Sequence, residues 1–146
     1  MLITAIHPIK EIQQDTAIPM ALSRISAGFP SPADDHLDAH LDLNSLLVEH
    51  PTSTFFVRVD GESMKGAGIR TGDVLVVDRA LEPKPGDVVL AVLGGEFTVK
   101  RWIRSRGSWL LQAENPDYPD IPVGPETDFE IWGVVSFAIH DLRCSP

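Results

Sequence analysis

The sequence contains a single cysteine, Cys144, among its 146 residues. A lone thiol cannot close a disulfide within the chain and lacks the partners of a structural zinc site, which excludes a disulfide-stapled secreted fold. No apolar run approaches the roughly 20 residues that a membrane-spanning helix needs. The first residues also lack the basic and apolar regions of a signal peptide. We therefore interpret Cys144 as a free thiol in a reducing compartment and expect a cytoplasmic chain with no membrane partner.

Positive charge is also scarce. Lys and Arg number 12 against 21 Asp and Glu, a net charge of −9. Proteins that bind a phosphate backbone cluster Lys and Arg on one surface, so we expect no direct binding to nucleic acid. Residues 28–50 contain no Lys or Arg but five acidic residues. This stretch predicts an extended acidic arm, with a short helix around Leu43 to Glu49 that ends before Pro51.

The second part of the chain is rich in short apolar runs separated by turn residues. These runs predict a mostly β fold, a compact multi-stranded domain over residues 53–146, whereas residues 1 to about 52 read as irregular. Gly94-Gly95 predicts a two-residue hairpin. The nearly continuous apolar run Asp87–Leu93 predicts a central strand covered on both faces. The expected strands are Phe55–Asp60, Asp73–Asp78, Asp87–Leu93, Glu96–Ile103, Ser108–Gln112 and Ile131–Ile139.

Ser63 lies in a turn directly after the first of these strands, in Gly61-Glu62-Ser63-Met64. In that position a serine can act as a nucleophile, and the backbone N–H groups of a tight turn can stabilise an oxyanion. An ordinary turn serine that caps Lys65 or Gly66 explains the residue equally well.

Lys100 lies in the strand after the Gly-Gly turn, on the same face as Thr98 and Trp102 because side chains alternate along a strand. At pH 7 a lysine with a pKa near 10.4 is neutral in only about 4 of 10,000 molecules, so a lysine base needs burial that lowers its pKa. A Ser–Lys pair is then workable. A strand lysine at a sheet edge is the alternative, and the residues alone leave both open.

Several motifs in order resemble the LexA/UmuD peptidase family, and the resemblance covers the chain from Ala27 to Val135. Ser63 and Lys100 are separated by 100 − 63 = 37 residues, the usual spacing in that family. The matching segments are Ala27 to Ala33, Asp42-Leu43-Asn44, Gly61 to Met64, Gly72-Asp73, Gly86-Asp87, Gly95 to Lys100, Glu114-Asn115-Pro116 with Tyr118, and Gly133-Val134-Val135.

The resemblance implies a serine endopeptidase that acts on itself. Ser63 would be the nucleophile and Lys100 the base, with the backbone N–H groups of Ser63 and Glu62 binding the oxyanion. The chain would be cut between Ala27 and Gly28, with no cofactor or metal. The domains would then be an arm of residues 1–27 removed by cleavage, an acidic arm of residues 28–52, and a peptidase and dimerisation domain of residues 53–146.

Within the family the sequence resembles the UmuD branch, because the 27 residues before Gly28 are too few for a helix-turn-helix domain. This branch supplies accessory subunits of error-prone translesion DNA polymerases in the SOS response. The resemblance implies three partners: a second copy in a homodimer, a UmuC-type polymerase subunit, and the RecA–single-stranded DNA filament that stimulates cleavage. The alternatives are a non-cleaving dimeric module that regulates the polymerase and a signal-peptidase-like protease, which would need a membrane anchor.

Overall fold

The structure is a computed structural model that describes residues 1–9, 18–20 and 39–143. The chain divides into two units. One contains Met1–Ile9 and His50–Pro146, and the other contains Lys10–Glu49.

The larger unit is built on one eight-stranded sheet in which all neighbouring strands are antiparallel. The strand order is β1-β4-β5-β10-β6-β7-β8-β9. Two short 3-10 turns, η1 (Pro51–Ser53) and η2 (Lys65–Ala67), precede and follow β4. The strands are β1 (Leu2–Pro8), β4 (Thr54–Asp60), β5 (Val74–Asp78), β6 (Val88–Leu93), β7 (Glu96–Ser105), β8 (Ser108–Gln112), β9 (Ile121–Val123) and β10 (Phe129–Ile139).

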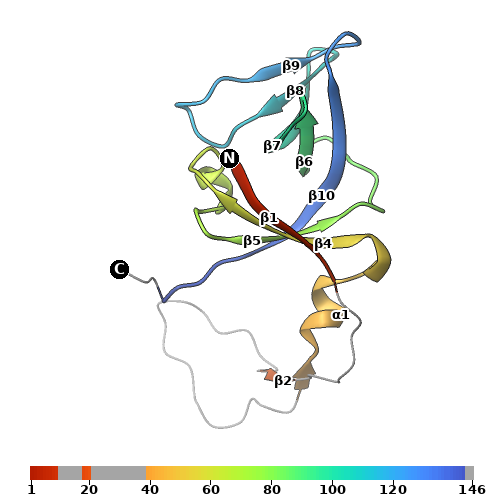
Figure 1. Ribbon diagram of the computed structural model, residues 1–146, viewed down its shortest axis with the longest axis vertical. Coiled ribbons are helices and arrows are strands. Elements are labelled where there is room, and N and C mark those ends of the chain that lie inside the picture. The colour runs from red at the N-terminus through yellow and green to blue at the C-terminus, as the bar shows by residue number, and fades with distance from the viewer. Residues whose placement is uncertain (10–17, 21–38, 144–146) are drawn as a thin grey trace. The chain divides into compact units, whose positions relative to one another are not determined.

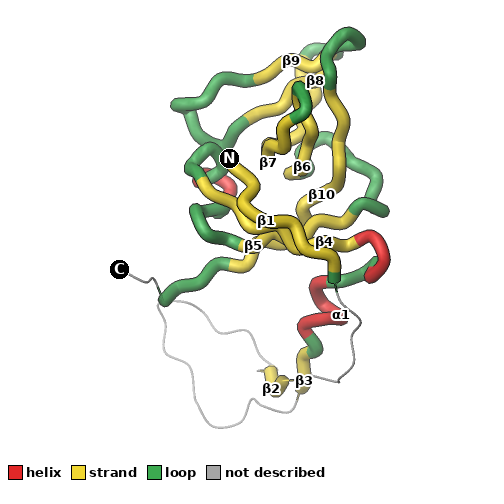
Figure 2. Tube along the Cα trace, viewed as in Figure 1, coloured by secondary structure: helices red, strands yellow, loops and turns green. Residues whose placement is uncertain are grey.

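The longest strand, β10, joins the two halves of this sheet (Figure 1). Its first part, from Phe129 to Val134, pairs with β6, and its second part, from Val134 to Ile139, pairs with β5. The register shifts within each part, once around Trp132 and once around Ser136. Such irregularities bend a strand and increase its twist, so the sheet curls (Figure 2).

Two clusters of buried side chains form the core. β6 contributes to both, because Leu90 lies in the first cluster and Val89 in the second, and neither side chain is exposed to solvent. The first cluster comprises Val57, Val59, Met64, Ile69, Leu75, Val77, Leu90 and Val99, with Met1, Ile3 and Ile6 packed against it. The second comprises Val89, Ala91, Trp102, Leu111 and Val134, and in it the Trp102 and Trp109 rings stack.

The smaller unit contains β2 (Ile18–Met20), which pairs with β3 (Ala39–Leu41), and the helix α1 (Leu43–Leu47). The Asp42 side chain accepts a hydrogen bond from the Asn44 backbone N–H at 3.0 Å and so caps the start of α1. The predicted short helix is therefore confirmed. Within the described residues, no helix is long and apolar enough to span a membrane.

The mostly β fold and all six predicted strands are confirmed, with ends within two residues of the expected ones. The hairpin is confirmed as well, since Leu93 pairs with Glu96 across Gly94-Gly95. The expectation that the chain is irregular before residue 52 is wrong for Leu2–Pro8, which forms β1 along the edge of β4, and for Ile18–Met20 and Ala39–Leu41, which form β2 and β3. The other edge of the sheet is β9, which is not among the six predicted strands.

Candidate active site

Ser63 lies in the turn that leaves β4. Gly61 adopts a φ of +114°, which a residue with a side chain rarely adopts, and turns the chain sharply away from the strand. The next turn is closed by the Lys65 N–H, which donates to the Glu62 carbonyl at 3.2 Å. Met64 is fully buried in the first core cluster. The turn is therefore fixed on both sides of Ser63, and the Ser63 side chain is itself fully buried.

Lys100 lies in the middle of β7 and is 5% exposed. Its Nζ donates to Thr98 Oγ1 at 3.0 Å and to the Val99 carbonyl at 3.2 Å, and it lies 3.5 Å from Ser63 Oγ. A neutral amine has two N–H groups and one lone pair. Thr98 and Val99 can accept from both N–H groups, so the lone pair of a neutral Lys100 is left for the Ser63 hydroxyl or the Met1 amine.

Burial lowers the pKa of Lys100 below its ordinary value, because the charged form loses solvation. A hydrogen bond with the Met1 amino group acts in the opposite direction and raises that pKa by a smaller amount. The pKa of the Met1 amine is lowered, first by its own burial and then by the Lys100 charge and the hydrogen bond. The Lys100 charge thus opposes protonation of the Met1 amine, whereas Lys100 itself is kept below its ordinary pKa by burial alone.

The backbone around Ser63 contains free donors. Among the described residues, no group accepts a hydrogen bond from the N–H of Glu62 or Ser63. Buried donors are almost always paired in folded proteins, so an unpaired N–H at fully buried Ser63 is unusual. Such a donor is suited to bind an oxygen that gains negative charge during a reaction.

A loop after β8 contacts the Ser63 turn. The Asn115 side-chain amide donates to the Glu62 carbonyl at 2.9 Å, and the Gly66 N–H donates to the Glu114 carbonyl at 2.8 Å. The Glu114 carboxylate in turn pairs with Arg101 on β7, next to Lys100. β7 therefore holds Lys100 and also anchors the loop that holds the Ser63 turn.

The sequence indicates no role for Asn115 beyond its place in a matching motif. Its contact with Glu62 joins residues 53 positions apart, which no local pattern reveals. Thr98 was placed on the Lys100 face by strand alternation, and the 3.0 Å hydrogen bond confirms that placement. Ala27, Gly28 and Cys144 lie outside the described residues.

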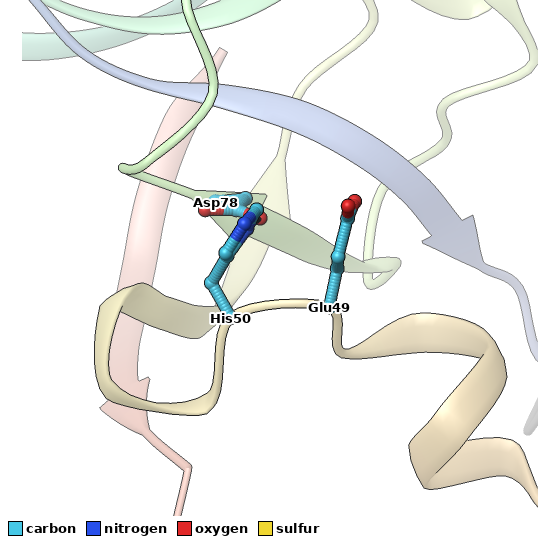
Figure 3. A group of neighbouring side chains, drawn as sticks. All are labelled: Glu49, His50 and Asp78. Carbon is cyan, nitrogen blue, oxygen red and sulfur yellow. Dashed lines mark hydrogen bonds and ion pairs between the residues drawn. The ribbon is translucent and has the colours of Figure 1, made fainter.

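Two imidazole–carboxylate pairs lie elsewhere in the larger unit. His50 Nδ1 is 2.6 Å from the Asp78 carboxylate (Figure 3), and His140 Nδ1 is 2.6 Å from Asp73. Both Asp side chains are buried, and each also accepts a hydrogen bond from a backbone N–H two or three residues away. These pairs fix the two ends of β5, Asp73 just before it and Asp78 at its last residue.

The curled antiparallel sheet brings buried Ser63 next to buried Lys100. This arrangement defines a candidate serine–lysine hydrolase site. The chain belongs to the peptidase S24 family, because the peptidase S24-like model matches residues 19–136. It is therefore a member of the LexA/UmuD family of UmuD-like type.

Known relatives agree with this assignment. The chain is 45% identical to protein SamA of Salmonella typhimurium over 138 residues, 94% of this chain and 95% of SamA. It is 46% identical to protein ImpA of Escherichia coli over 126 residues, 86% of this chain and 85% of ImpA. It is also 40% identical to the LexA repressor of Paracidovorax citrulli over 127 residues, which cover 87% of this chain and 55% of that repressor. Family and relatives together support a serine peptidase of the LexA/UmuD type with a role in SOS mutagenesis.

Proposed function

We propose that the protein is a self-cleaving serine peptidase in which Ser63 attacks the carbonyl carbon of Ala27 and Lys100 acts as the base. The observation that carries the proposal is the 3.5 Å approach of Lys100 Nζ to Ser63 Oγ between two buried side chains. Hydrogen bonds to a catalytic base are often long in a site without bound substrate and tighten when the substrate enters. The lowered pKa of Lys100 supports the same role, because only a neutral amine accepts the serine proton.

The proposed reaction forms an ester on Ser63 and then hydrolyses that ester. Neutral Lys100 accepts the proton of the Ser63 hydroxyl as Oγ bonds to the Ala27 carbonyl carbon, and the carbonyl oxygen becomes an oxyanion. The N–H groups of Ser63 and Glu62 donate to that oxyanion. As the Ala27–Gly28 bond breaks, protonated Lys100 gives its proton to the Gly28 nitrogen. Water then hydrolyses the Ala27 ester on Ser63 with Lys100 again as base, which restores the hydroxyl.

The products would be an arm of residues 1–27 and a chain that begins at Gly28. That chain would carry the acidic segment 28–52 and the peptidase and dimerisation domain of residues 53–146. We place the protein in the cytoplasm as a homodimer. The shortened product joins a UmuC-type polymerase subunit, and the RecA–single-stranded DNA filament stimulates the cleavage that produces it. The similarity to UmuD-like proteins supports these partners.

Intact mass spectrometry tests the cleavage directly. Purified chain incubated at about pH 10 should yield a fragment that begins at Gly28, and Ser63→Ala should yield none under the same conditions. Lys100→Ala should also block cleavage while keeping a cooperative thermal melt. A Ser63→Ala sample that still releases the Gly28 fragment would show that another residue is the nucleophile.

The filament is tested separately at neutral pH. RecA assembled on single-stranded DNA with a nucleotide should accelerate cleavage of the wild-type chain and leave Ser63→Ala intact. RecA without DNA is the matched control. If the filament changes nothing while alkaline cleavage proceeds, the peptidase assignment stands and the SOS partner is wrong. A chain that stays whole under both conditions is a non-cleaving module.

A further inference from the structure

Asn115 is buried, with only 6% of its surface exposed, and both polar atoms of its side chain make a hydrogen bond. Its Nδ2 donates to the Glu62 carbonyl at 2.9 Å, and its Oδ1 accepts from the Asp117 N–H at 3.0 Å. The Asn115 carbonyl also accepts from the Tyr118 N–H at 3.1 Å, which closes the loop into a turn. The side chain is therefore held by its own loop and reaches across to the turn that carries Ser63.

The group that Asn115 holds belongs to the same peptide unit as the Ser63 N–H. A peptide unit is planar, and in this trans peptide the C=O of Glu62 and the N–H of Ser63 point in opposite directions. A hydrogen bond that fixes the direction of the Glu62 carbonyl therefore fixes the direction of the Ser63 N–H. The Lys65 N–H donates to the same carbonyl at 3.2 Å, so two donors restrain the plane.

The loop also approaches the turn too closely for any residue other than glycine at position 66. A Cβ added to Gly66 would lie 2.6 Å from the Glu114 carbonyl oxygen, well inside van der Waals contact. The Gly66 N–H donates to that same oxygen at 2.8 Å. The Glu114 carbonyl, which accepts from Gly66, and the Asn115 amide, which donates to Glu62, thus hold the Ser63 turn on both sides of the nucleophile.

We propose that Asn115 is a positioning residue, which fixes the plane of the Glu62–Ser63 peptide so that the Ser63 N–H faces the oxyanion of the cleavage reaction. The inference rests on the proposed function, because it assigns the unpaired Ser63 N–H to the oxyanion. Asn115 touches neither Ser63 Oγ nor Lys100 Nζ among the contacts of the described residues, so its effect would run through the peptide plane alone.

The first test is the substitution Asn115→Asp in the full chain. An ionised aspartate keeps the shape and the acceptor for the Asp117 N–H but has no hydrogen to donate to the Glu62 carbonyl. Removing an oxyanion donor outright costs about 100- to 1,000-fold in rate, and misaligning one costs less. We expect the first-order rate of self-cleavage to fall about 10- to 100-fold. In Asn115→Ala, which adds no charge near Lys100, the midpoint of the rate–pH curve should stay where it is in the wild type.

Ser108→Glu is the matched control. It adds the same new charge at the exposed start of β8, across from Ser105, without touching the Glu62 carbonyl. It should cleave at close to the wild-type rate. Asn115→Ala serves as a second variant with no added charge, and all rates are compared well below each variant's melting temperature.

A peptide boronic acid that ends in boroalanine separates positioning from a merely structural role. Its tetrahedral adduct with Ser63 places an oxygen where the oxyanion forms, so its affinity should fall in Asn115→Asp in parallel with the cleavage rate. If the melting temperature falls while cleavage by the folded chain and boronate affinity stay at wild-type values, Asn115 is structural and the inference is wrong. A wild-type chain that neither cleaves nor binds the boronate overturns the proposed function itself, which is a different result.

Discussion

At the scale of single residues, the chemistry depends on the protonation of Lys100. Its burial lowers the pKa below the ordinary lysine value, and the neutral form is the one that accepts the Ser63 proton. The fraction of neutral amine rises with pH through the lowered pKa and then reaches a plateau. The groups around the amine are Thr98 Oγ1, the Val99 carbonyl, Ser63 Oγ and the Met1 amine, and none of them carries negative charge that would restore an ordinary pKa.

We therefore predict that self-cleavage accelerates as pH rises and then levels off, with a midpoint below the ordinary lysine pKa. The slope below the midpoint should be about tenfold per pH unit, since one proton must leave. Rate constants from intact mass between pH 6 and pH 11 measure the curve. Lys65→Ala, which removes an exposed lysine close to Ser63 in sequence, should give the same midpoint. A rate independent of pH would mean that no lysine is the base.

The roles of these residues were predictable to different degrees. Ser63 and Lys100 each have an ordinary interpretation when read alone, and it is the similarity to a family with the same 37-residue spacing that pairs them. Their contact depends on how the sheet curls, which local patterns do not encode. Asn115 could not be predicted, because its partner Glu62 lies 53 residues away and the interaction depends on the shape of two loops.

At the scale of elements, the two bends of β10 let one strand serve both halves of the sheet. Gly133 lies at the first bend, where the register with β6 shifts. A Cβ added there would lie 2.6 Å from Val77 Cγ1 and 3.3 Å from Arg79 Cγ. Val77 is a fully buried residue of β5, so it has no free space into which to move.

We predict that Gly133→Ala lowers the free energy of unfolding by about 1–3 kcal/mol, the usual cost of an overpacked core. Urea denaturation followed by tryptophan fluorescence measures it. Gly124→Ala is the matched control, because no atom lies within 4 Å of its added Cβ and its φ is not in the left-handed region. Equal midpoints for the two variants would mean that β5 and β10 move apart without cost.

The strands that the sequence predicted are those whose own residues and flanking turns mark them as strands. The central strands have apolar runs bounded by Gly or Pro, and each pairs with others that share its core. The two strands of the eight-stranded sheet that were missed, β1 and β9, are its edges. β9 contains Pro122, which an edge strand tolerates and which reads as a loop signal. β1 pairs with a strand more than 45 residues later, so nothing near it in sequence indicates a partner.

At the scale of the whole molecule, β1 links the fold to the proposed reaction. It pairs with β4 from Leu2 to Pro8, and Met1, Ile3 and Ile6 pack against the first core cluster. All of these residues lie before the proposed cut at Ala27–Gly28. Cleavage would therefore leave an edge strand of the sheet attached by noncovalent contacts alone. The pairing of a strand that belongs to the same chain does not depend on protein concentration, whereas a separate peptide dissociates from the sheet on dilution.

We predict that the melting temperature of the cleaved protein rises with its concentration, and more steeply than that of the uncleaved chain. For a bound fragment well above its dissociation constant, each tenfold increase in free fragment adds about 1.4 kcal/mol to the stability. Thermal melts of a fully cleaved, unfractionated sample at several concentrations measure this effect. Ser63→Ala, which stays whole, reports the part of the dependence that comes from dimerisation.

Added synthetic peptide of residues 1–9 should raise the melting temperature of the cleaved sample and leave that of Ser63→Ala unchanged. If the melting temperature depends on concentration in the same way for the cleaved and the whole chain, β1 does not stabilise the fold. Its dissociation on dilution would then leave the stability unchanged.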